Sequence, residues 1–305
     1  MKNKRKIWSW ILGISGILVV GTVLLGYFLY KDVTDTVKDM HEPIDRKVSE
    51  KRTEPITFKE KDPFSVLVLG VDERDNDKGR SDTMIVMIVN PLTNTTTMVS
   101  IPRDTYTEIV GKGIQDKINH AYAFGGIEMS MATAENLLDI PIDYVVQVNM
   151  ESFQDIVDAV GGITVNNDID FAAGGHTFSK GELSLDGEEA LSFIRMRYED
   201  PRGDFGRQDR QKQVIQGVLK QGASVGSIMN YKTIFAALGK NIRTNLTFDE
   251  MVSIQSNYRG AVGNVNQLYI QNGKGKMIDG VWYYMMDDNE LNTIQASLKS
   301  ELAMK

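Results

Sequence analysis

The distribution of apolar residues divides the chain into an apolar segment, a charged segment and a mixed segment. Residues 7–30, IWSWILGISGILVVGTVLLGYFLY, contain no charged residue. A helix of about 20 apolar residues is long enough to cross the hydrocarbon core of a bilayer, so this run predicts a transmembrane anchor. Residues 31–61 are charged and weakly apolar, which is typical of a stalk, partly helical. Residues 62–305 predict one folded domain.

Short apolar runs rich in β-branched residues predict the strands of this domain. FSVLVLGV and TMIVMIVN are such runs, and TTTMVSI pairs with the second across the turn PLTN. The segments DYVVQVNM, GITVN and GVWYYM predict further strands, whereas GIEMSMATAENLLDI, ESFQDIVDAV, LDGEEALSFIR and GRQDRQKQVIQGVLKQG predict helices. This alternation predicts an α/β fold, a three-layer α-β-α sandwich on a central mixed β-sheet, because the turn at Pro91 makes at least one strand pair antiparallel.

The charges beside the apolar run predict its orientation. Basic residues dominate positions 2–6, whereas one lysine and one aspartate follow at 31 and 32. Excess positive charge stays on the cytoplasmic side, so residues 1–6 form a cytoplasmic tail and the folded domain lies outside the cell, as in a single-pass type II membrane protein. A cleaved signal peptide is the alternative. The run is longer than the 7–15-residue apolar core of such peptides, and no A-x-A-like cleavage site follows it.

Composition excludes several classes of function. The net charge is -7 and the sequence pI is about 5.2, so a general affinity for nucleic acid is not expected. The chain has no cysteine, which excludes disulfides, thiolate metal sites and cysteine nucleophiles. The histidines are His41, His120 and His176, too few and too scattered to support a histidine metal cluster or a Ser-His-Asp triad. His120 is interpreted as structural.

Arginine is concentrated in the stretch RMRYEDPRGDFGRQDRQKQ, which holds five of the thirteen arginines of the chain. If Arg195 and Arg197 emerge extended after a helix, their spacing of two places both side chains on one side. Arg207 and Gln211, four apart, share a helix face. Asp204 can accept hydrogen bonds from such guanidinium groups and hold one in place. A salt-bridged helix surface is the alternative, but such surfaces are usually built from lysine and glutamate.

Charged residues also follow the first and third predicted strands, where ligands of open α/β sheets tend to bind. Asp72 ends the first strand, Arg80 and Asp82 close the loop after it, and Arg103 follows the third. Mg²⁺ takes one or two carboxylates and completes its shell with water and phosphate oxygens, so Asp72 and Asp82 are candidate ligands. Taken alone, these residues are better explained as turn acids in a solvated loop and as surface ion pairs.

The two groups together predict a multiply charged phosphate ligand with a divalent cation, most simply a pyrophosphate. The phosphate loop G-x-x-x-x-G-K-[ST] is absent from the sequence, and no convincing G-x-G-x-x-G follows a strand. Nucleotide hydrolysis is therefore not expected.

Five blocks of sequence, in order, carry a resemblance to a known family. They are VLVLGVDERDNDKGRSDTMIV, MVSIPRDTYTEI, DKINHAYAFGG, VNMESFQDIVDAVGGITV and LDGEEALSFIRMRYEDPRGDFGRQDRQKQVI. The chain resembles the LytR-CpsA-Psr family over about residues 64–221, and the N-terminal anchor is also as the family has it. The resemblance is greatest to the Gram-positive polyisoprenyl-teichoic acid–peptidoglycan teichoic acid transferases.

The resemblance implies a membrane-bound phosphotransferase whose outer domain, residues 62–305, is catalytic. Such an enzyme binds a polyprenyl-pyrophosphate-linked glycopolymer, lays the lipid in an apolar tunnel beside the sheet, and passes the polymer phosphate to a muramic acid hydroxyl of peptidoglycan. The product is a phosphodiester. The implied partners are the lipid-linked donor, the peptidoglycan acceptor and the membrane, with no nucleic acid.

The resemblance also implies roles for individual residues. The family's metal ligands fall on Asp72 and Asp82, with Mg²⁺ as the implied cofactor and Mn²⁺ as the alternative. Arg103, Arg197 and Asp204 are the implied catalytic residues. The pyrophosphate-binding residues fall on Arg80, Arg103, Arg195, Arg197, Arg207 and Gln211.

Two other functions are compatible with the same residues. A lipid pyrophosphate phosphatase would have the same site and use water as its acceptor, and analysis of the product distinguishes it from a transferase. A non-catalytic membrane-bound regulator is the other alternative. No motif transfers to the chain beyond about residue 223.

Overall fold

The computed structural model describes residues 31, 34–36, 38–44, 49–52, 54–72, 79–149, 153–222, 237–239, 241–262 and 264–304. The predicted cytoplasmic tail and transmembrane anchor, residues 1–30, lie outside the described residues. Within the described part of the chain, no helix has both the length and the apolar character needed to cross a bilayer.

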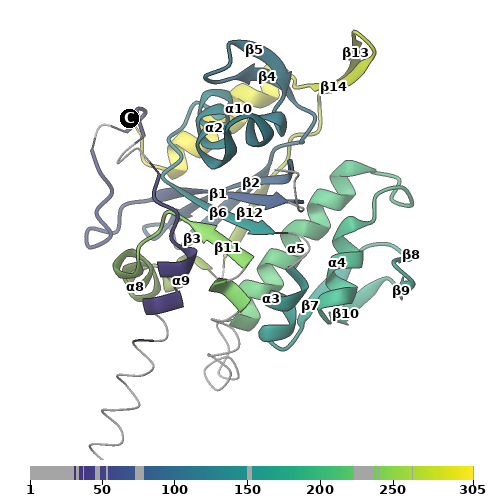
Figure 1. The fold of residues 1–305 in the computed structure, drawn as a ribbon, viewed down its shortest axis with the longest axis horizontal. Helices are drawn as coiled ribbons and strands as arrows, with labels where there is room; N and C mark the ends of the chain where they lie inside the picture. Colours follow the sequence, from purple (N-terminus) through teal and green to yellow (C-terminus); the bar gives the residue numbers. More distant parts are fainter. Residues whose placement is uncertain are drawn as a thin grey trace, which may run out of the picture.

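A six-stranded mixed sheet forms the centre of the domain (Figure 1). Its strand order is β11-β6-β1-β2-β3-β12. β1 runs parallel to β6 and β3 runs parallel to β12, whereas the other neighbours are antiparallel. The prediction of a mixed α/β fold on a central mixed sheet is therefore confirmed. The strands are β1 (Phe64–Val71), β2 (Ser81–Asn90), β3 (Thr95–Ser100), β6 (Tyr144–Asn149), β11 (Ile242–Thr244) and β12 (Val265–Leu268).

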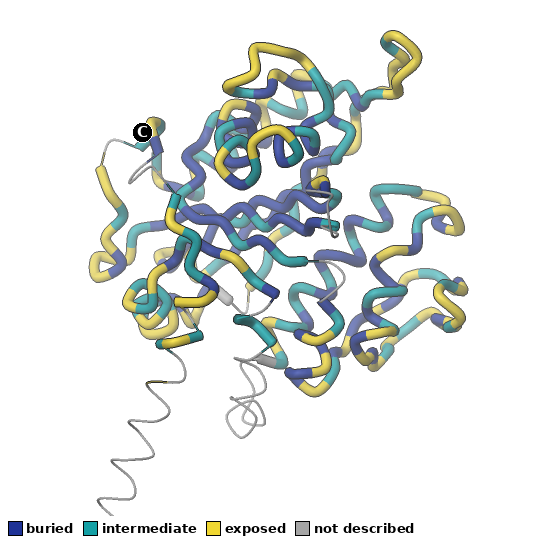
Figure 2. The backbone as a smooth tube through the Cα atoms, viewed as in Figure 1, coloured by how far each residue is buried: buried dark blue, intermediate teal, exposed yellow. Residues whose placement is uncertain are grey.

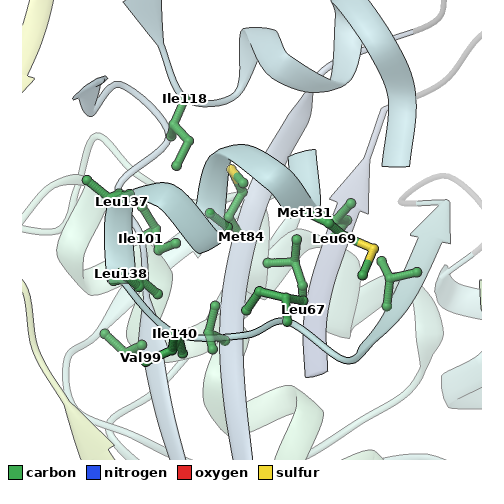
Figure 3. Packing of buried hydrophobic residues seen from close by; sticks show 14 of the residues in the cluster. Leu67, Leu69, Met84, Val99, Ile101, Ile118, Met131, Leu137, Leu138 and Ile140 are labelled. Atoms are coloured by element: carbon green, nitrogen blue, oxygen red, sulfur yellow. The ribbon is translucent and has the colours of Figure 1, made fainter. Parts of the chain in front are cut away.

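Helices cover both faces of this sheet because successive strand side chains point to opposite sides. Leu67 and Leu69 of β1 belong to the larger apolar cluster together with Leu138 (Figure 3). Leu298, from another helix, belongs to the same cluster. Val66 belongs to a second cluster with Phe58 and Tyr258 on the other face. The first face is covered by α2 (His120–Leu138) and α10 (Asp288–Glu301), and the second by α8 (Phe248–Asn257) and α9 (Arg259–Val262).

Beside the central sheet, three helices and two hairpins enclose an apolar cluster of their own, with a buried inner side (Figure 2). Rings of Phe171, Phe178 and Phe193 meet there with centroids 4.8 to 5.6 Å apart. The strand predicted from GITVN exists but pairs in a hairpin outside the central sheet. The elements are α3 (Phe153–Ala159), α4 (Gly187–Arg195), α5 (Asp204–Gly222), β7 (Ile163–Asn167), β8 (Phe171–Ala173), β9 (His176–Phe178) and β10 (Gly181–Leu185).

Two further hairpins lie on the α2 side of the sheet (Figure 1). The first is β4 (Tyr106–Ile109) with β5 (Ile114–Lys117), and the second is β13 (Lys274–Ile278) with β14 (Val281–Met285). The second hairpin projects away from the body of the domain.

The later part of the predicted stalk is packed against the domain. Arg52 donates from Nε and Nη2 to the two carboxylate oxygens of Asp143, with both distances 2.7 Å. Asp143 also accepts from the backbone N–H of Ser65 at 2.8 Å. Phe58 is 8% exposed and its ring contacts that of Phe64. Within the described residues, the chain therefore contributes to the folded domain before residue 62.

Candidate active site

Asp82 occupies a β-bulge at the end of the central strand pair. Gly70 pairs with Thr83 and Val71 pairs with Ser81, so Asp82 is an extra residue on β2. Its backbone N–H donates to the carbonyl of Arg80 at 3.1 Å instead of to the neighbouring strand. A bulge redirects the side chain of the extra residue, which explains why a carboxylate in a mostly buried strand reaches the edge of the sheet.

Arg103 follows β3 and meets Asp82 at this edge. Its Nη1 donates to Oδ2 of Asp82 at 2.8 Å, while Asn119 Nδ2 donates to Oδ1 at 3.3 Å. Burial alone would lower the pKa of the Arg103 guanidinium, but the carboxylates of Asp82 and Asp104 raise it above its ordinary value. Arg103 Nε is buried and has no hydrogen-bond partner among the described residues. The guanidinium is therefore a fixed cation that retains donor capacity.

The first turn of α5 supplies the opposite side of the site. Arg207 Nη2 lies 2.5 Å from Oδ1 of Asp204, and Arg197 Nε lies 3.8 Å from the same oxygen. Burial lowers the pKa of Arg207, Asp204 offsets this in part, and the like charges of Arg103 and Arg197 lower the pKa further. Nε of Arg207 is buried and unpartnered within the described part of the chain.

Positive charge exceeds negative charge where these side chains converge. Arg103, Arg197 and Arg207 face Asp82, Asp104 and Asp204. Lys117, whose Nζ lies 2.6 Å from Asp104, is a fourth cation, so one positive charge is left over. Guanidinium groups with free N–H donors bind phosphate oxygens strongly and often through two parallel hydrogen bonds. The cluster is therefore suited to a phosphate-containing anion.

The remaining predicted residues surround this cluster. Arg80 precedes β2 and is exposed, and its carbonyl accepts from the N–H groups of both Asp72 and Asp82. Arg195 is the last residue of α4 and is exposed, whereas Arg197 is half-buried. The expectation that Arg195 and Arg197 share one side of an extended segment is wrong, because the helix continues through Arg195. Gln211, 7% exposed, lies one turn after Arg207 on α5.

The donor chemistry at the bulge suits a hard cation. Asp72 directly follows β1, and Asp82 lies on the neighbouring strand. The Oδ1 atom of Asn119 is buried with no hydrogen-bond partner among the described residues, although its Nδ2 contacts Asp82. No group of three or more histidine, aspartate or glutamate residues is placed to hold a metal within the described ranges. Carboxylate and amide oxygens fit Mg²⁺, which binds through one or two carboxylates together with phosphate and water.

An apolar pocket of about 50 Å³ lies on the sheet face opposite α2 and next to α5. Val68, Val148 and Ile215 are half-buried there, which is unusual for aliphatic side chains on central elements. Gln211 lines the pocket and lies one turn from Arg207, so the pocket adjoins the arginine cluster. The other lining residues are Leu69, Gly70, Thr83, Phe153, Ile194 and Val214.

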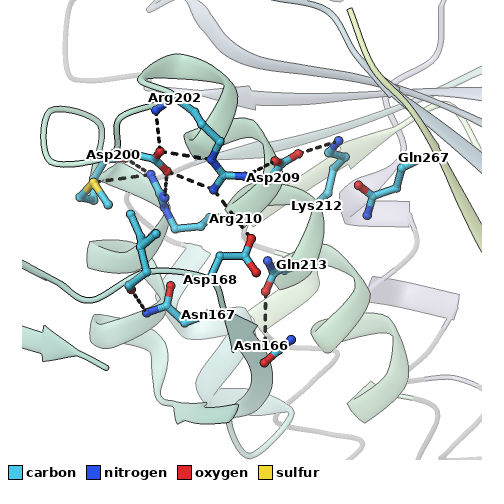
Figure 4. Close-up of polar contacts among 12 residues, drawn as sticks. Asn166, Asn167, Asp168, Asp200, Arg202, Asp209, Arg210, Lys212, Gln213 and Gln267 are labelled. Carbon is cyan, nitrogen blue, oxygen red and sulfur yellow. Dashed lines mark hydrogen bonds and ion pairs between the residues drawn. The ribbon is translucent and has the colours of Figure 1, made fainter. Parts of the chain in front are cut away.

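Sequence reasoning missed a second arginine network behind the site (Figure 4). Asp200 has a fully buried side chain and accepts from Arg210 Nη1 at 2.6 Å and from Arg202 Nε at 3.2 Å. Arg210 also donates to the carbonyls of Phe193 and Met196 at 3.0 and 2.6 Å. Arg210 therefore ties α5 to the end of α4, immediately before Arg197.

The segment D-P-R-G, residues 200–203, was the available signal for this network, because aspartate before such a turn accepts from backbone N–H groups two residues on. The N–H of Arg202 donates to Asp200 at 2.8 Å in this way. Gly206 leaves room for the carboxylate of Asp200, because a Cβ at this position would lie 1.7 Å from Oδ2 of Asp200.

Comparisons with known proteins find similarity along nearly the whole chain. Residues 27–300 match the model of the LytR_cpsA_psr family. A relative from Bacillus subtilis (strain 168), named polyisoprenyl-teichoic acid–peptidoglycan teichoic acid transferase TagU, is 54% identical over 301 residues, which is 99% of this chain and 97% of the relative.

Solved structures extend the likeness to the fold. The crystal structure of B. subtilis TagU is 53% identical, with a TM-score of 0.66 over 80% of this chain and 99% of that chain. The LytR-CPS2A-psr family protein YwtF (TagT), with bound octaprenyl pyrophosphate lipid, is 28% identical, with a TM-score of 0.69 over 87% of this chain and 100% of that chain.

Proposed function

This chain belongs to the LytR_cpsA_psr family, and from that premise we propose that it attaches a polyprenyl-pyrophosphate-linked anionic glycopolymer to peptidoglycan through a phosphodiester bond. Identity of 54% over nearly the full length of a teichoic acid transferase supports wall teichoic acid as the polymer. The octaprenyl pyrophosphate bound to TagT supports a polyprenyl pyrophosphate as the head of the donor.

The observation that carries the proposal is the convergence of Arg103, Arg197 and Arg207 on one half-buried position beside Asp82 and Asp204. Phosphoryl transfer depends mainly on positioning and on cancelling the charge of the transferring group. Arginines held by carboxylates meet both needs, since they are oriented before the ligand arrives.

In the proposed reaction, the guanidinium groups hold the pyrophosphate of the donor. A hydroxyl oxygen of the acceptor forms a bond to the phosphorus nearest the polymer, while the bond from that phosphorus to the bridging oxygen breaks. Polyprenyl phosphate leaves with the electron pair of that bond. Asp204 orients Arg207, whose Nη2 lies 2.5 Å from Oδ1 of Asp204, or accepts the proton of the acceptor hydroxyl. Arg80, Arg195 and Gln211 complete the binding of the donor.

The cation and the lipid have separate places in this proposal. Asp72 and Asp82 would hold Mg²⁺, which would neutralise charge on the phosphate oxygens when bound. The pocket lined by Val68, Val148 and Gln211 would widen to take the first part of the polyprenyl chain. Residues 7–30 would anchor the protein in the membrane with the catalytic domain outside the cell, which confines enzyme and lipid-linked donor to the same surface and raises their effective concentration.

The proposal is tested by the product of one reaction. Full-length protein in detergent is incubated with Mg²⁺, uncrosslinked peptidoglycan and a polyprenyl-pyrophosphate glycan labelled in its sugar. The expected result is label covalently joined to the glycan strand. Soluble phosphorylated polymer as the sole product would establish the phosphatase instead, and an intact donor would leave a non-catalytic regulator as the better account.

A further inference from the structure

The β13–β14 hairpin is joined directly to two residues that adjoin the arginine cluster. The N–H of Tyr284 donates to the carbonyl of Asp104 at 2.9 Å, and Asp104 follows Arg103. The ring of Tyr284 packs edge-on against Phe205, with centroids 5.9 Å apart, and Phe205 follows Asp204. One face of β14 is therefore turned toward the first turn of α5 and the site.

Trp282 lies on that same face. It precedes Tyr284 by two residues on a strand, so both side chains point to one side, with Trp282 farther out along the hairpin. The indole lies against Gly275 of the paired strand, since a Cβ there would be 2.6 Å from Trp282 Nε1. Gly275 thus leaves room for the ring, and Trp282 remains 44% exposed. A large aromatic ring is therefore held against backbone, on the same face of β14 as Tyr284.

The surroundings of this ring suit a saccharide. Met277 pairs with Trp282 across the hairpin and is 60% exposed, so the surface here is apolar. The apolar C–H face of a pyranose stacks on such a ring, and the indole N–H can bond a hydroxyl. Lys274 and Lys276 pair with Met285 and Tyr283, so they lie on the other face of the hairpin and leave the face of Trp282 uncharged.

The direction of the reaction decides which saccharide binds there. The attacking and leaving oxygens of a phosphoryl transfer are roughly in line. The apolar pocket proposed for the lipid lies on the sheet face opposite α2. The hairpin lies on the α2 side of the sheet (Figure 1). There the ring centroid of Tyr283 lies 5.0 Å from that of Tyr106 of β4. A group that enters opposite the departing lipid phosphate therefore passes the hairpin.

We propose that Trp282, supported by Gly275, is an acceptor subsite that stacks a pyranose ring of the peptidoglycan glycan strand. This assignment rests on the proposed transferase function. It makes Trp282 a determinant of acceptor affinity and leaves binding of the donor to the arginines and the apolar pocket.

Steady-state kinetics of the full-length protein test the assignment. With donor saturating, Trp282→Ala should raise KM for soluble uncrosslinked glycan strands about tenfold, with kcat and the donor KM unchanged. Trp282→Tyr should recover much of the acceptor affinity. Leu92→Ala, in the exposed turn at the opposite end of β2, is the matched control and should leave both KM values unchanged. An unchanged acceptor KM in Trp282→Ala, or a raised donor KM alone, overturns the proposal.

Fluorescence separates this inference from the transferase function itself. The chain has three tryptophans, and Trp282 is the one outside the predicted anchor. In the full chain carrying Trp8→Phe and Trp10→Phe, glycan strands added without donor should shift the emission of Trp282. Absence of a shift, with transfer intact, overturns the acceptor subsite. A shift in a protein that forms no transfer product overturns the transferase and leaves glycan binding at Trp282 supported.

Discussion

Arg103 donates from Nη1 to Oδ2 of Asp82 across 2.8 Å, and this bond connects the end of β3 to the bulge of β2. The contact fixes the guanidinium at the sheet edge before any ligand arrives. It also keeps one carboxylate beside the position that the phosphate would occupy. The same carboxylate is a proposed ligand of Mg²⁺, so donor binding and cation binding are expected to depend on each other.

Chelation and replacement of the carboxylates test the role of the cation. Chelation should abolish transfer, and added Mg²⁺ should restore it. In Asp72→Asn and Asp82→Asn the Mg²⁺ concentration for half-maximal activity should rise at least about tenfold, because each loses a charged oxygen ligand. Asp249→Asn, on the exposed first turn of α8, is the control. An unchanged Mg²⁺ requirement in both site variants would exclude these residues as ligands.

Asp204→Asn tests the proposed proton acceptor. The amide keeps the shape of the side chain but cannot accept the hydroxyl proton, so kcat should fall by about 10²-fold or more. Affinity for the donor should change far less. Rates and donor binding are measured on the same preparation. Transfer near the wild-type rate with full donor binding would show that Asp204 acts on the arginines alone.

The buried pair of Asp200 and Arg210 should stabilise the α4–α5 junction. Removing either partner leaves an uncompensated buried charge, so Asp200→Ala and Arg210→Ala should each lower the free energy of unfolding by about 3–5 kcal/mol. The double variant should lose less than the sum of the two. Urea denaturation measures all three. The exposed pair of Arg243 with Glu42 is the control, where Arg243→Ala should cost about 0–1 kcal/mol. Equal small losses at both sites would contradict a structural role for the pair.

Stability should depend on pH through Asp200. Burial acts to raise its pKa, but hydrogen bonds from Arg202 and Arg210 hold the pKa below the ordinary value of 3.8. A lowered pKa in the folded state means that the stabilisation is complete above pH 3.8 and is lost as the pH falls through the folded-state pKa. The urea midpoint of the wild type should therefore drop below pH 3.8, and that of Asp200→Asn should drop less. If the urea midpoints of the wild type and Asp200→Asn fell equally with pH, Asp200 would not be the source of the pH dependence.

The central strands and the helices around the site could be predicted from the sequence because their burial imposes a regular pattern. β1 was predicted with its observed bounds, since nearly all its residues are buried and β-branched or aliphatic. α4 was predicted from its apolar spacing, and Asp186 and Glu189 cap its start. Of the β13–β14 hairpin, the sequence predicts only β14. The first residues of β13 are lysine and glycine, so β13 has no apolar run from which a strand could be predicted.

The site could be predicted as a set of residues but not as a geometry. Carboxylates and arginines at strand ends indicated an anion site, and most of them converge. The sequence could not predict which arginines of the arginine-rich stretch belong to the site and which to the network around Asp200. Arg207 and Arg210 lie three apart on one helix, yet Arg207 pairs with Asp204 and Arg210 with Asp200. The bulge at Asp82 has no sequence signature, since it depends on how two strands pair.

The rate of transfer in arginine variants of the full-length protein shows whether the arginine cluster acts on the transferring phosphate. Label from a polyprenyl-pyrophosphate glycan is followed into uncrosslinked peptidoglycan for Arg103→Ala, Arg207→Ala and the surface control Arg243→Ala. Loss of one fixed donor to the transferring phosphate should lower kcat by about 10²- to 10³-fold in the first two, with the control unchanged. Transfer by Arg103→Ala and Arg207→Ala at the rate of the control would show that these arginines do not stabilise the transferring phosphate.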